Sequence, residues 1–420
     1  MEISIESLKA PCICGKTHPL FVNDLWIEPG ALRRLPELLH AYHSPAVICD
    51  ENTYAAAGKT ACAMLPNCVC IKLPARNLHA NERGVALAKE QLKKVPDILV
   101  AAGSGTIHDI TRFIAHEKGI PFVSVPTAAS VDGFVSTVAA MTWEGFKKTF
   151  SAVSPLYVLA DTDIFSKAPQ CLTASGVADL LGKYTALADW KASHLLTGEY
   201  ICPHICELED KALQTLRGCL PELAKGSKEA YETLMYGLLL SGLAMQMAGN
   251  SRPASGAEHH LSHLWEMEAI NSYVDAYHGQ KVGVGLLLAA DVYHRAAKKL
   301  RAGAGTVPYH SIETALLKEK FPEHLLHSIL KENDPDPMAN LTDETLLAKE
   351  TELADILDAV PTTAELSAIL EQVGGVRTMA DIGLNASLRT DSLRLSPYVR
   401  NRLTAMRILK RFDFYEEVIS

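Results

Sequence analysis

Short apolar runs alternate with helix-like segments over the first part of this sequence, from residue 46 to about 161. Runs such as AVIC, DILVAAG and PFVSVP are separated by longer stretches such as NERGVALAKEQLKKV. Because parallel strands need a crossover that is usually a helix, this alternation predicts a parallel sheet covered by helices. Within it, TVAAMTWEGFKKTFSAV predicts a hairpin, since two β-rich runs flank a polar turn that contains glycine.

The pattern changes after Pro169, where long segments of helical period begin. They include ASGVADLLGKYTALADWKASHLL and YETLMYGLLLSGLAMQMAG, so the second half is predicted to be nearly all helical. We therefore expect an α/β domain over residues 1–168, with a Rossmann-like parallel sheet that binds a dinucleotide. An all-α domain that binds metal and substrate is expected over residues 169–420. The polar, proline-containing stretch from 330 to 350 is expected to be an exposed connection.

The composition excludes some classes of partner. With 420 residues, 48% of them hydrophobic, the chain can bury a large core. A net charge of -9 gives no basic field for a polynucleotide or an anionic membrane, so neither is expected as a partner. The N-terminus lacks a basic segment followed by an apolar run, and the most apolar stretch, Met235 to Ala248, is too short to span a bilayer. We expect a cytoplasmic enzyme.

The ten cysteines are scattered, several of them in apolar strand-like runs, which is typical of reduced core residues rather than of a disulfide framework. One local cluster differs. Cys12, Cys14 and His18, in CICGKTH, could bind zinc. No second ligand pair at a recognised spacing accompanies them, so a structural turn is the interpretation that the sequence favours.

A glycine-rich turn, AGSGTIHD, follows the apolar run DILVA and precedes a helix-like segment. The backbone N–H groups and the dipole of a helix N-terminus favour a phosphate group there. Gly103 and Gly105 would allow the backbone close to a pyrophosphate, and Thr106 could donate a hydroxyl. Because His108 or Asp109 stands where the third glycine of G-x-G-x-x-G would be, a plain tight turn remains the alternative.

Two other strand ends carry polar side chains. Asp50 ends the run AVICD, from which a carboxylate can reach ribose hydroxyls; a helix or turn cap is the alternative. The run PFVSV leads into PTAASVDGFVS, where Thr127, Ser130 and Ser136 could bind cofactor. Asp132 lies at the same rim. Serine and aspartate also close turns without any further function.

Three segments of the helical half carry a carboxylate and imidazoles, namely GVADLLGK, RPASGAEHHLSH and YHGQKVG. Such groups supply the nitrogen and oxygen ligands that zinc or nickel takes. On a helix His259 and His263 share one face, while His260 points about 100 degrees away, so His259 and His263 are expected to act together. Asp179 lies in an apolar helix and needs a cation there, either a metal ion or a basic partner such as Lys183.

Taken in order, these segments resemble the iron-containing alcohol dehydrogenase and dehydroquinate synthase superfamily, and within it the sn-glycerol-1-phosphate dehydrogenase branch of bacterial type. GSGTIHD, PTAASVDG, RPASGAEHHLSH and HGQKVG carry the resemblance, which runs over about residues 20–300. It implies reversible reduction of dihydroxyacetone phosphate by NADH or NADPH to sn-glycerol 1-phosphate, one nickel or zinc ion, and a homodimer. The alternatives are a glycerol dehydrogenase or a dehydroquinate synthase-like cyclase of the same superfamily, or a catalytically silent binding protein with this fold.

The resemblance also implies roles for individual residues. Metal ligands would be Asp179, His259 and His278, although spacing back from His278 as in the glycerol dehydrogenases would choose His260 instead of His259. Substrate contacts would be Asp132, Asp179 and His263. Cofactor contacts would be Asp50, Gly103, Ser104, Gly105, Thr106, Ile107, Thr127, Ala128, Ala129, Ser130 and Ser136. Arg252 and Lys183 are the expected donors to the substrate phosphate, on their charge and their position near the motifs alone.

Overall fold

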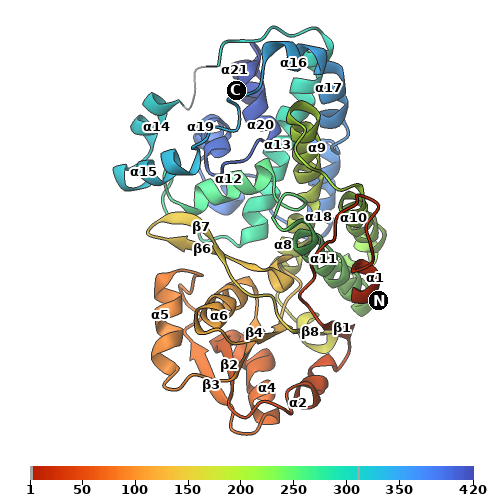
Figure 1. The fold of residues 1–420 in the computed structure, drawn as a ribbon, viewed down its shortest axis with the longest axis vertical. Coiled ribbons are helices and arrows are strands. Elements are labelled where there is room, and N and C mark those ends of the chain that lie inside the picture. Colours follow the sequence, from red (N-terminus) through yellow and green to blue (C-terminus); the bar gives the residue numbers. More distant parts are fainter. Residues whose placement is uncertain (1–2, 310–312) are drawn as a thin grey trace. The chain divides into compact units, whose positions relative to one another are not determined.

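The computed structural model describes residues 3–309 and 313–420 of the chain, which fold into two compact units (Figure 1). The first unit comprises Met1–Glu144, Lys148–Leu180 and Glu207–Asn250. The second comprises Gly145–Lys147, Leu181–Cys206 and Ser251–Ser420. The predicted domain boundary at residue 168 is not tested by this grouping and stays a prediction.

A six-stranded sheet forms the centre of the first unit. Its strand order is β1-β8-β5-β4-β2-β3, and every pair of neighbours is parallel. The strands are β1 (Asp24–Glu28), β2 (Pro45–Asp50), β3 (Val69–Leu73), β4 (Ile98–Gly103), β5 (Phe122–Pro126) and β8 (Tyr157–Asp161). The α/β fold with a parallel sheet that the alternating pattern predicts is therefore confirmed.

Both faces of this sheet are buried. Leu99 and Ala101 of β4 belong to one apolar cluster, while Val100 and Ala102 belong to another. Because successive strand residues point to opposite faces, burial on both sides requires a continuous apolar run, which explains ILVAAG. The helices of this unit are α1 (Ile5–Leu8), α2 (Leu35–Leu38), α3 (Glu51–Thr53), α4 (Lys59–Met64), α5 (Glu82–Gln91), α6 (Gly105–Lys118), α7 (Thr162–Phe165), most of α8 (Gln170–Leu181) and of α10 (Pro203–Ala224), and α11 (Lys228–Ala248).

The predicted hairpin is present as the strand pair β6 (Val138–Trp143) and β7 (Phe146–Ser151). Two residues join the strands, Glu144 with φ 52° and Gly145 with φ 75°. Positive φ at both central residues is the geometry of the tight hairpin turn that matches the twist of the strands.

The second unit is built from helices, as the periodicity after Pro169 predicts. Its helices are α9 (Lys183–Thr197), α12 (Ala257–Glu266), α13 (His278–Arg301), α14 (Thr314–Lys320), α15 (Glu323–Glu332), α16 (Asp343–Ala348), α17 (Glu350–Asp358), α18 (Thr363–Gln372), α19 (Arg389–Leu395), α20 (Ala405–Ile408) and α21 (Tyr415–Ile419). A side chain at Gly285 of α13 would place its Cβ 2.6 Å from the carbonyl oxygen of Glu258 in α12. Glycine therefore allows these two helices, which carry the predicted histidines, to pack closely.

The stretch from 330 to 350 is not simply the exposed connection that its composition predicts. Asn333 and Met338 are buried, and α16 begins within the stretch. The side-chain amide of Asn333 donates to the Tyr398 carbonyl at 2.7 Å, so this buried polar side chain has a hydrogen-bond partner.

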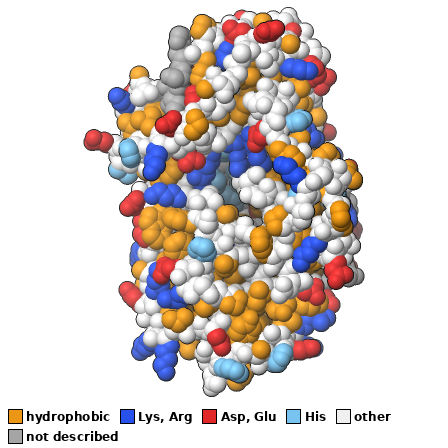
Figure 2. All heavy atoms as spheres, in the orientation of Figure 1, with side chains coloured by type: hydrophobic (Ala, Val, Ile, Leu, Met, Phe, Trp, Pro, Cys, Tyr) orange, Lys and Arg blue, Asp and Glu red, His pale blue; other side chains and the backbone are white. Residues whose placement is uncertain are grey.

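Acidic and basic side chains are interspersed on the face shown in Figure 2. Among the described residues, no helix is long and apolar enough to cross a membrane.

Candidate active site

The carboxyl ends of β2 and β4 meet where the strand order of the sheet reverses. β3 lies on one side of β2 and β4 on the other, although β4 follows β3 in the sequence. In open parallel sheets, ligands bind in the crevice formed at such a reversal. β2 and β4 end at Asp50 and Gly103, two of the predicted cofactor residues.

The glycine-rich turn joins β4 to α6, whose N-cap is Ser104. The N–H groups of the first turn of a helix lack intrahelical acceptors, so they can bind a phosphate oxygen. A side chain at Gly103 would place its Cβ 2.5 Å from the Cβ of Ile107. The tight packing of turn on helix therefore explains this glycine, and it leaves the amides of Gly105 and Thr106 in the first turn of α6.

His108 occupies the position of the missing third glycine. Its ring is buried; Nδ1 donates to the Ser104 carbonyl at 2.9 Å, and Nε2 accepts from the Ser124 hydroxyl at 2.8 Å. Burial, and then the positive charge of Arg112, lower the pKa of His108 to about 3. A neutral imidazole thus fastens the glycine-rich turn to β5.

Acid is expected to destabilise the chain through His108. Because the pKa of His108 in the folded state is lowered from 6.5 to about 3, the folded state disfavours the proton. The stabilisation is present above the ordinary pKa and is lost as the pH falls toward 3, by about 2 kcal/mol between pH 7.5 and 5. Urea unfolding should show a smaller loss for His108→Gln than for the wild type. His116→Gln, exposed on the same helix, is the control and should behave like the wild type. An equal loss in His108→Gln would contradict this assignment.

Two predicted cofactor residues close local turns. Asp50 accepts a hydrogen bond from the Thr53 N–H at 2.8 Å, and the Thr53 hydroxyl accepts from the Asp50 N–H at 2.9 Å. This capping box begins α3, so Asp50 has the helix-cap role that the sequence offers as the alternative to ribose binding. The Ser136 hydroxyl donates to the Val138 carbonyl at 2.9 Å. A cofactor role for Asp50 and Ser136 stays a prediction.

The segment after β5, residues 127–130, is buried. The N–H of Thr127 donates to the Gly103 carbonyl at 3.0 Å, which ties this segment to the glycine-rich turn. From the other side α8 packs against it, since a Cβ at Gly176 would lie only 2.0 Å from the Ala129 carbonyl oxygen. The predicted cofactor residues 103–107 and 127–130 are therefore neighbours, and α8 holds the second group in place.

Asp132 and Asp179, two predicted substrate residues, lie together in the first unit. The Asp132 N–H donates to Oδ2 of Asp179 at 2.9 Å, and both side chains are buried. The Ser241 hydroxyl of α11 lies 3.1 Å from Oδ2 of Asp132 and 3.0 Å from Oε1 of Glu209. Its single proton can donate to one of these oxygens at a time. Sequence reasoning missed Ser241 and Glu209, because no local motif marks them.

Three imidazoles gather in the second unit. His259 and His263 are one turn apart on α12, and His278 is the first residue of α13. Ring centroids are 5.2 Å apart for His259 and His278, 6.0 Å for His259 and His263, and 6.1 Å for His263 and His278. Helical spacing thus places His259 beside the other two rings.

His260 has a different environment. It is fully buried, and no hydrogen-bond partner of either ring nitrogen is found among the described residues. Burial lowers the pKa of His260 well below 6.5, and the charges of Arg402, Arg400 and Arg252 lower it further. A cluster of positive charge is a poor place for a metal cation, so of the doublet His259 is the better ligand candidate.

Glu258 fixes the orientation of His259. Nδ1 of His259 donates to Oε1 of Glu258 at 2.6 Å, and the N–H of Gly256 donates to the same oxygen at 2.7 Å. Burial raises the pKa of Glu258, but the hydrogen bonds from His259, Thr185 and Gly256 outweigh it, and the pKa is lowered. A carboxylate that accepts from Nδ1 selects the tautomer whose lone pair is on Nε2, as metal-binding histidines require. The sequence signal was available, since Glu258 directly precedes the doublet.

A second set of possible ligands in this unit is His263, Glu266 and His278, whose ligand atoms lie within 4.8 Å of one another. Lys147 and Lys281 contact Glu266 at 2.8 and 3.0 Å. Although burial opposes it, these ammonium groups hold the pKa of Glu266 well below its usual range. They already neutralise the carboxylate and would repel a divalent cation, so we do not assign a metal to this set.

The pKa of His263 is lowered well below 6.5, first by burial and then by Arg400, while Glu266 opposes the shift. His263 is accordingly neutral near pH 7, with one ring nitrogen as donor and the other as acceptor. An imidazole in water titrates near neutral pH, whereas the pKa of His263 is well below that range.

The expected phosphate donors are engaged in contacts of their own. Nε of Arg252 donates to Glu199 at 2.8 Å, and Nη1 donates to the Leu403 carbonyl at 2.8 Å. Nζ of Lys183, which is fully buried, donates to the Ala254 carbonyl at 3.1 Å. These contacts stabilise the second unit, and a phosphate role for either residue stays a prediction.

Comparisons with known proteins show which family the chain belongs to. A family model described as iron-containing alcohol dehydrogenase matches residues 26–169. The chain is 34% identical over 424 residues to a glycerol-1-phosphate dehydrogenase [NAD(P)+] of Geobacillus stearothermophilus, covering 98% of each chain. The chain belongs to the glycerol-1-phosphate dehydrogenase family. The resemblance seen in the four sequence motifs is therefore confirmed.

Another protein named glycerol-1-phosphate dehydrogenase matches less of the chain. The protein of that name from Pyrococcus horikoshii is 34% identical over 239 residues, 56% of this chain and 68% of its own. Among solved structures, an iron-containing alcohol dehydrogenase from Thermotoga maritima has a TM-score of 0.61 at 14% identity, covering 96% of this chain and 97% of its own. Glycerol dehydrogenase from Schizosaccharomyces pombe has a TM-score of 0.54 at 18% identity, covering 86% and 95%. These two show the shared fold.

Proposed function

We propose that the chain catalyses the reversible NAD(P)H-dependent reduction of dihydroxyacetone phosphate to sn-glycerol 1-phosphate. The observation that carries the proposal is the 34% identity, over 98% of both chains, to a relative named glycerol-1-phosphate dehydrogenase [NAD(P)+]. The glycine-rich turn at the strand-order reversal, whose N–H groups suit a phosphate, and the cluster of three imidazoles support it. We also propose that it acts as a homodimer, which light scattering during gel filtration would test.

The proposed cofactor site extends along the carboxyl ends of β2, β4 and β5. Residues 103–107 would hold the pyrophosphate at the N-terminus of α6, and residues 127–130 would cover it from the side of α8. Asp50 would bind the ribose hydroxyls. Because Asp50 already accepts the Thr53 N–H through Oδ1, this contact would use its other carboxylate oxygen.

We propose Asp179, His259 and His278 as ligands of one divalent ion, nickel or zinc. One carboxylate and two imidazoles are a donor set that both ions accept, and such sites keep positions open for substrate. In the second unit, the hydrogen bond from His259 to Glu258 supports the assignment, since ligand histidines are commonly oriented in this way.

With both cofactors bound, the site would have a hydride donor and a Lewis acid for the C2 carbonyl of the substrate. The chain supplies positioning and proton transfer. Asp132, held by Ser241, would orient a substrate hydroxyl. His263, neutral near pH 7, would donate a proton toward the C2 oxygen from one ring nitrogen and recover a proton from water at the other.

The activity is tested by NADH and NADPH oxidation with dihydroxyacetone phosphate and, separately, with dihydroxyacetone. The proposal predicts turnover with the phosphorylated substrate and little with the other. A glycerol dehydrogenase would prefer dihydroxyacetone, and a dehydroquinate synthase-like cyclase would show no net NADH oxidation. Either result would contradict the proposed function.

Metal removal is expected to abolish this activity. Dialysis against EDTA should remove the ion, because its proposed ligands form an open site with only three protein donors. Activity should return on addition of nickel or zinc, and the more effective ion would identify the preferred metal. Full turnover in protein shown to be metal-free by elemental analysis would refute a metal-dependent mechanism.

Glu258→Gln is expected to weaken metal binding by roughly 10- to 100-fold, the usual effect of losing such a supporting carboxylate. Loss of the negative charge makes the His259 imidazole a weaker ligand without removing any proposed donor to the metal. Chelator competition measures the affinity, and Glu268→Gln, exposed just beyond α12, is the matched control. Unchanged affinity in Glu258→Gln would show that Glu258 has only a packing role.

A further inference from the structure

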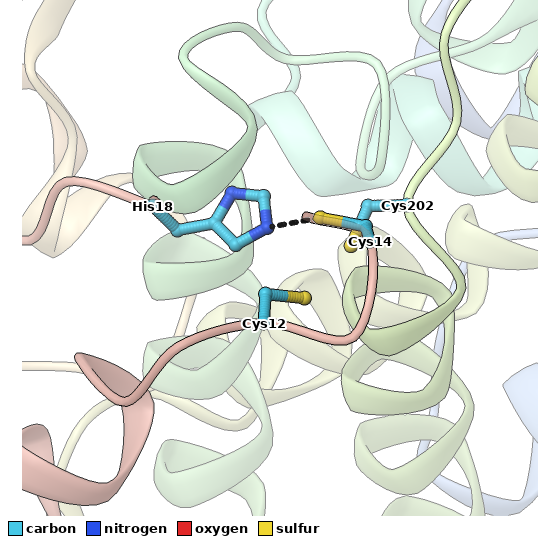
Figure 3. Close-up of side chains that lie close together, drawn as sticks. All are labelled: Cys12, Cys14, His18 and Cys202. Atoms are coloured by element: carbon cyan, nitrogen blue, oxygen red, sulfur yellow. Dashed lines mark hydrogen bonds between the residues drawn. The ribbon is translucent and has the colours of Figure 1, made fainter. Parts of the chain in front are cut away.

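The N-terminal arm between α1 and β1 carries a cluster that the proposed reaction does not use. Cys12, Cys14 and His18 belong to the first unit, and their side chains converge in Figure 3. None of the ten cysteines, all within the described residues, forms a disulfide. Thiols and an imidazole that face one another in a reduced protein are the donor types of a structural zinc site.

The distances within the cluster suit a tetrahedral ion. Sγ of Cys14 lies 3.3 Å from Nε2 of His18, and the ligand atoms of Cys12, Cys14 and His18 are all within 4.8 Å of one another. With ordinary zinc–sulfur and zinc–nitrogen bonds, a tetrahedral site separates sulfur from nitrogen by about 3.6 Å and two sulfurs by about 3.8 Å. Small side-chain movements would therefore accommodate the ion.

His18 is oriented as a ligand would be. The side chain is buried, and its Nδ1 lies 2.7 Å from the Met247 carbonyl at the end of α11. A carbonyl only accepts, so Nδ1 carries the proton and the lone pair is on Nε2, the atom that faces Cys14. A backbone carbonyl that holds the other ring nitrogen is a common support for zinc-binding histidines.

The backbone around Cys14 favours its thiolate. Gly15 has φ +78°, which glycine adopts without strain, and its N–H donates to the Cys12 carbonyl at 3.0 Å. The resulting turn directs the N–H of Lys16 toward Sγ of Cys14 at 3.4 Å. An N–H aimed at sulfur stabilises the negative charge that a metal-bound thiolate carries. The turn that the sequence favours is therefore present, and its geometry suits a loop that carries metal ligands.

We propose that Cys12, Cys14 and His18 bind a structural zinc ion that holds the N-terminal arm on α11. The Met247 carbonyl and Gln246, whose side-chain oxygen accepts from the Phe21 N–H at 3.0 Å, already tether the arm there. Structural zinc sites take a fourth ligand, and a third cysteine is the common choice. Because α11 also carries Ser241, which holds Asp132, the ion would support the substrate site indirectly.

Metal analysis of purified chain grown with added zinc tests the proposal. The wild type should hold two ions per chain, and Asp179→Ala, which lacks a proposed catalytic ligand, should keep one. His18→Ala and Cys14→Ser should each lose one ion relative to the wild type. Cys62→Ser is the matched control, because Cys62 forms a separate thiol pair with Cys68 at 2.8 Å and should leave the metal count unchanged.

Cobalt replaces zinc as a spectroscopic probe and separates the two sites. Asp179→Ala loaded with Co²⁺ should show near-ultraviolet thiolate-to-cobalt absorption, which imidazole and carboxylate ligands do not produce. X-ray absorption then counts two or three sulfur ligands, and serine variants of the remaining cysteines test which one supplies a third. If His18→Ala fails to fold, the cobalt spectrum of Asp179→Ala decides alone. Absence of thiolate absorption, a count below two sulfurs, or full metal content in folded His18→Ala would overturn the proposal.

Discussion

His259→Ala is expected to lose the proposed catalytic metal and to lower kcat/KM for dihydroxyacetone phosphate by about a thousandfold. A cation at the carbonyl contributes several kcal/mol of transition-state stabilisation, and about 4 kcal/mol corresponds to that factor. The ring centroids of His259 and His278 are 5.2 Å apart, and Glu258 orients the His259 ring. The substitution therefore removes a nitrogen ligand that is already oriented for the metal. Elemental analysis and initial rates of NADH oxidation measure the two effects.

The neighbouring histidine is the matched control. His260→Gln should retain the metal and most of the activity, because the positive charges of three arginines act on His260 and disfavour a metal cation there. Asp179→Ala and His278→Ala should resemble His259→Ala. If His260→Gln loses the metal while His259→Ala keeps it, the ligand assignment is wrong by one residue.

Gly176→Ala is expected to weaken NAD(P)H binding and to lower activity without changing any proposed contact residue. The added Cβ would lie 2.0 Å from the Ala129 carbonyl oxygen, so either α8 or the segment 127–130 must move. Overpacking of this kind costs about 1 to 3 kcal/mol, which corresponds to roughly 5- to 150-fold if it falls on cofactor binding. Asp179 lies one turn further along α8 and would shift with it.

The matched control for this change is Gly133→Ala. Gly133 lies shortly after the segment 127–130, and a Cβ at this position would meet no atom within 4 Å. The control should keep the wild-type KM for NAD(P)H and the wild-type melting temperature. A Gly176→Ala variant that is less stable but has an unchanged KM would show that the segment 127–130 does not contact the cofactor.

Local patterns were sufficient to predict the fold class. Burial on both faces makes parallel strands continuous runs of apolar residues, and ILVAAG and FVSVP stand out for that reason. The hairpin follows from a two-residue turn. In contrast, the grouping of residues 207–250 with the sheet depends on contacts such as that between Ser241 and Asp132, which are 109 residues apart. No periodicity encodes such a pairing.

Local patterns were also sufficient to predict part of the candidate site. Helical spacing places His259 and His263 on one face, and their ring centroids are indeed 6.0 Å apart. Contacts between distant segments were not predictable, and the ion pair of Lys147 and Glu266 at 2.8 Å is an example. Charge alone also suggested Arg252 for the phosphate, whereas its pairing with Glu199 becomes visible only in three dimensions.

The buried imidazole of His108 limits how the glycine-rich turn can be redesigned. Completing the G-x-G-x-x-G motif with His108→Gly would leave the Ser124 hydroxyl without the ring that it now bonds, while the Ser104 carbonyl would keep the backbone N–H of residue 108. A buried polar group deprived of its partner costs about 1 to 3 kcal/mol. Grafting a glycine-rich fingerprint from another dehydrogenase would thus damage this loop, and a successful design must replace His108 and Ser124 together.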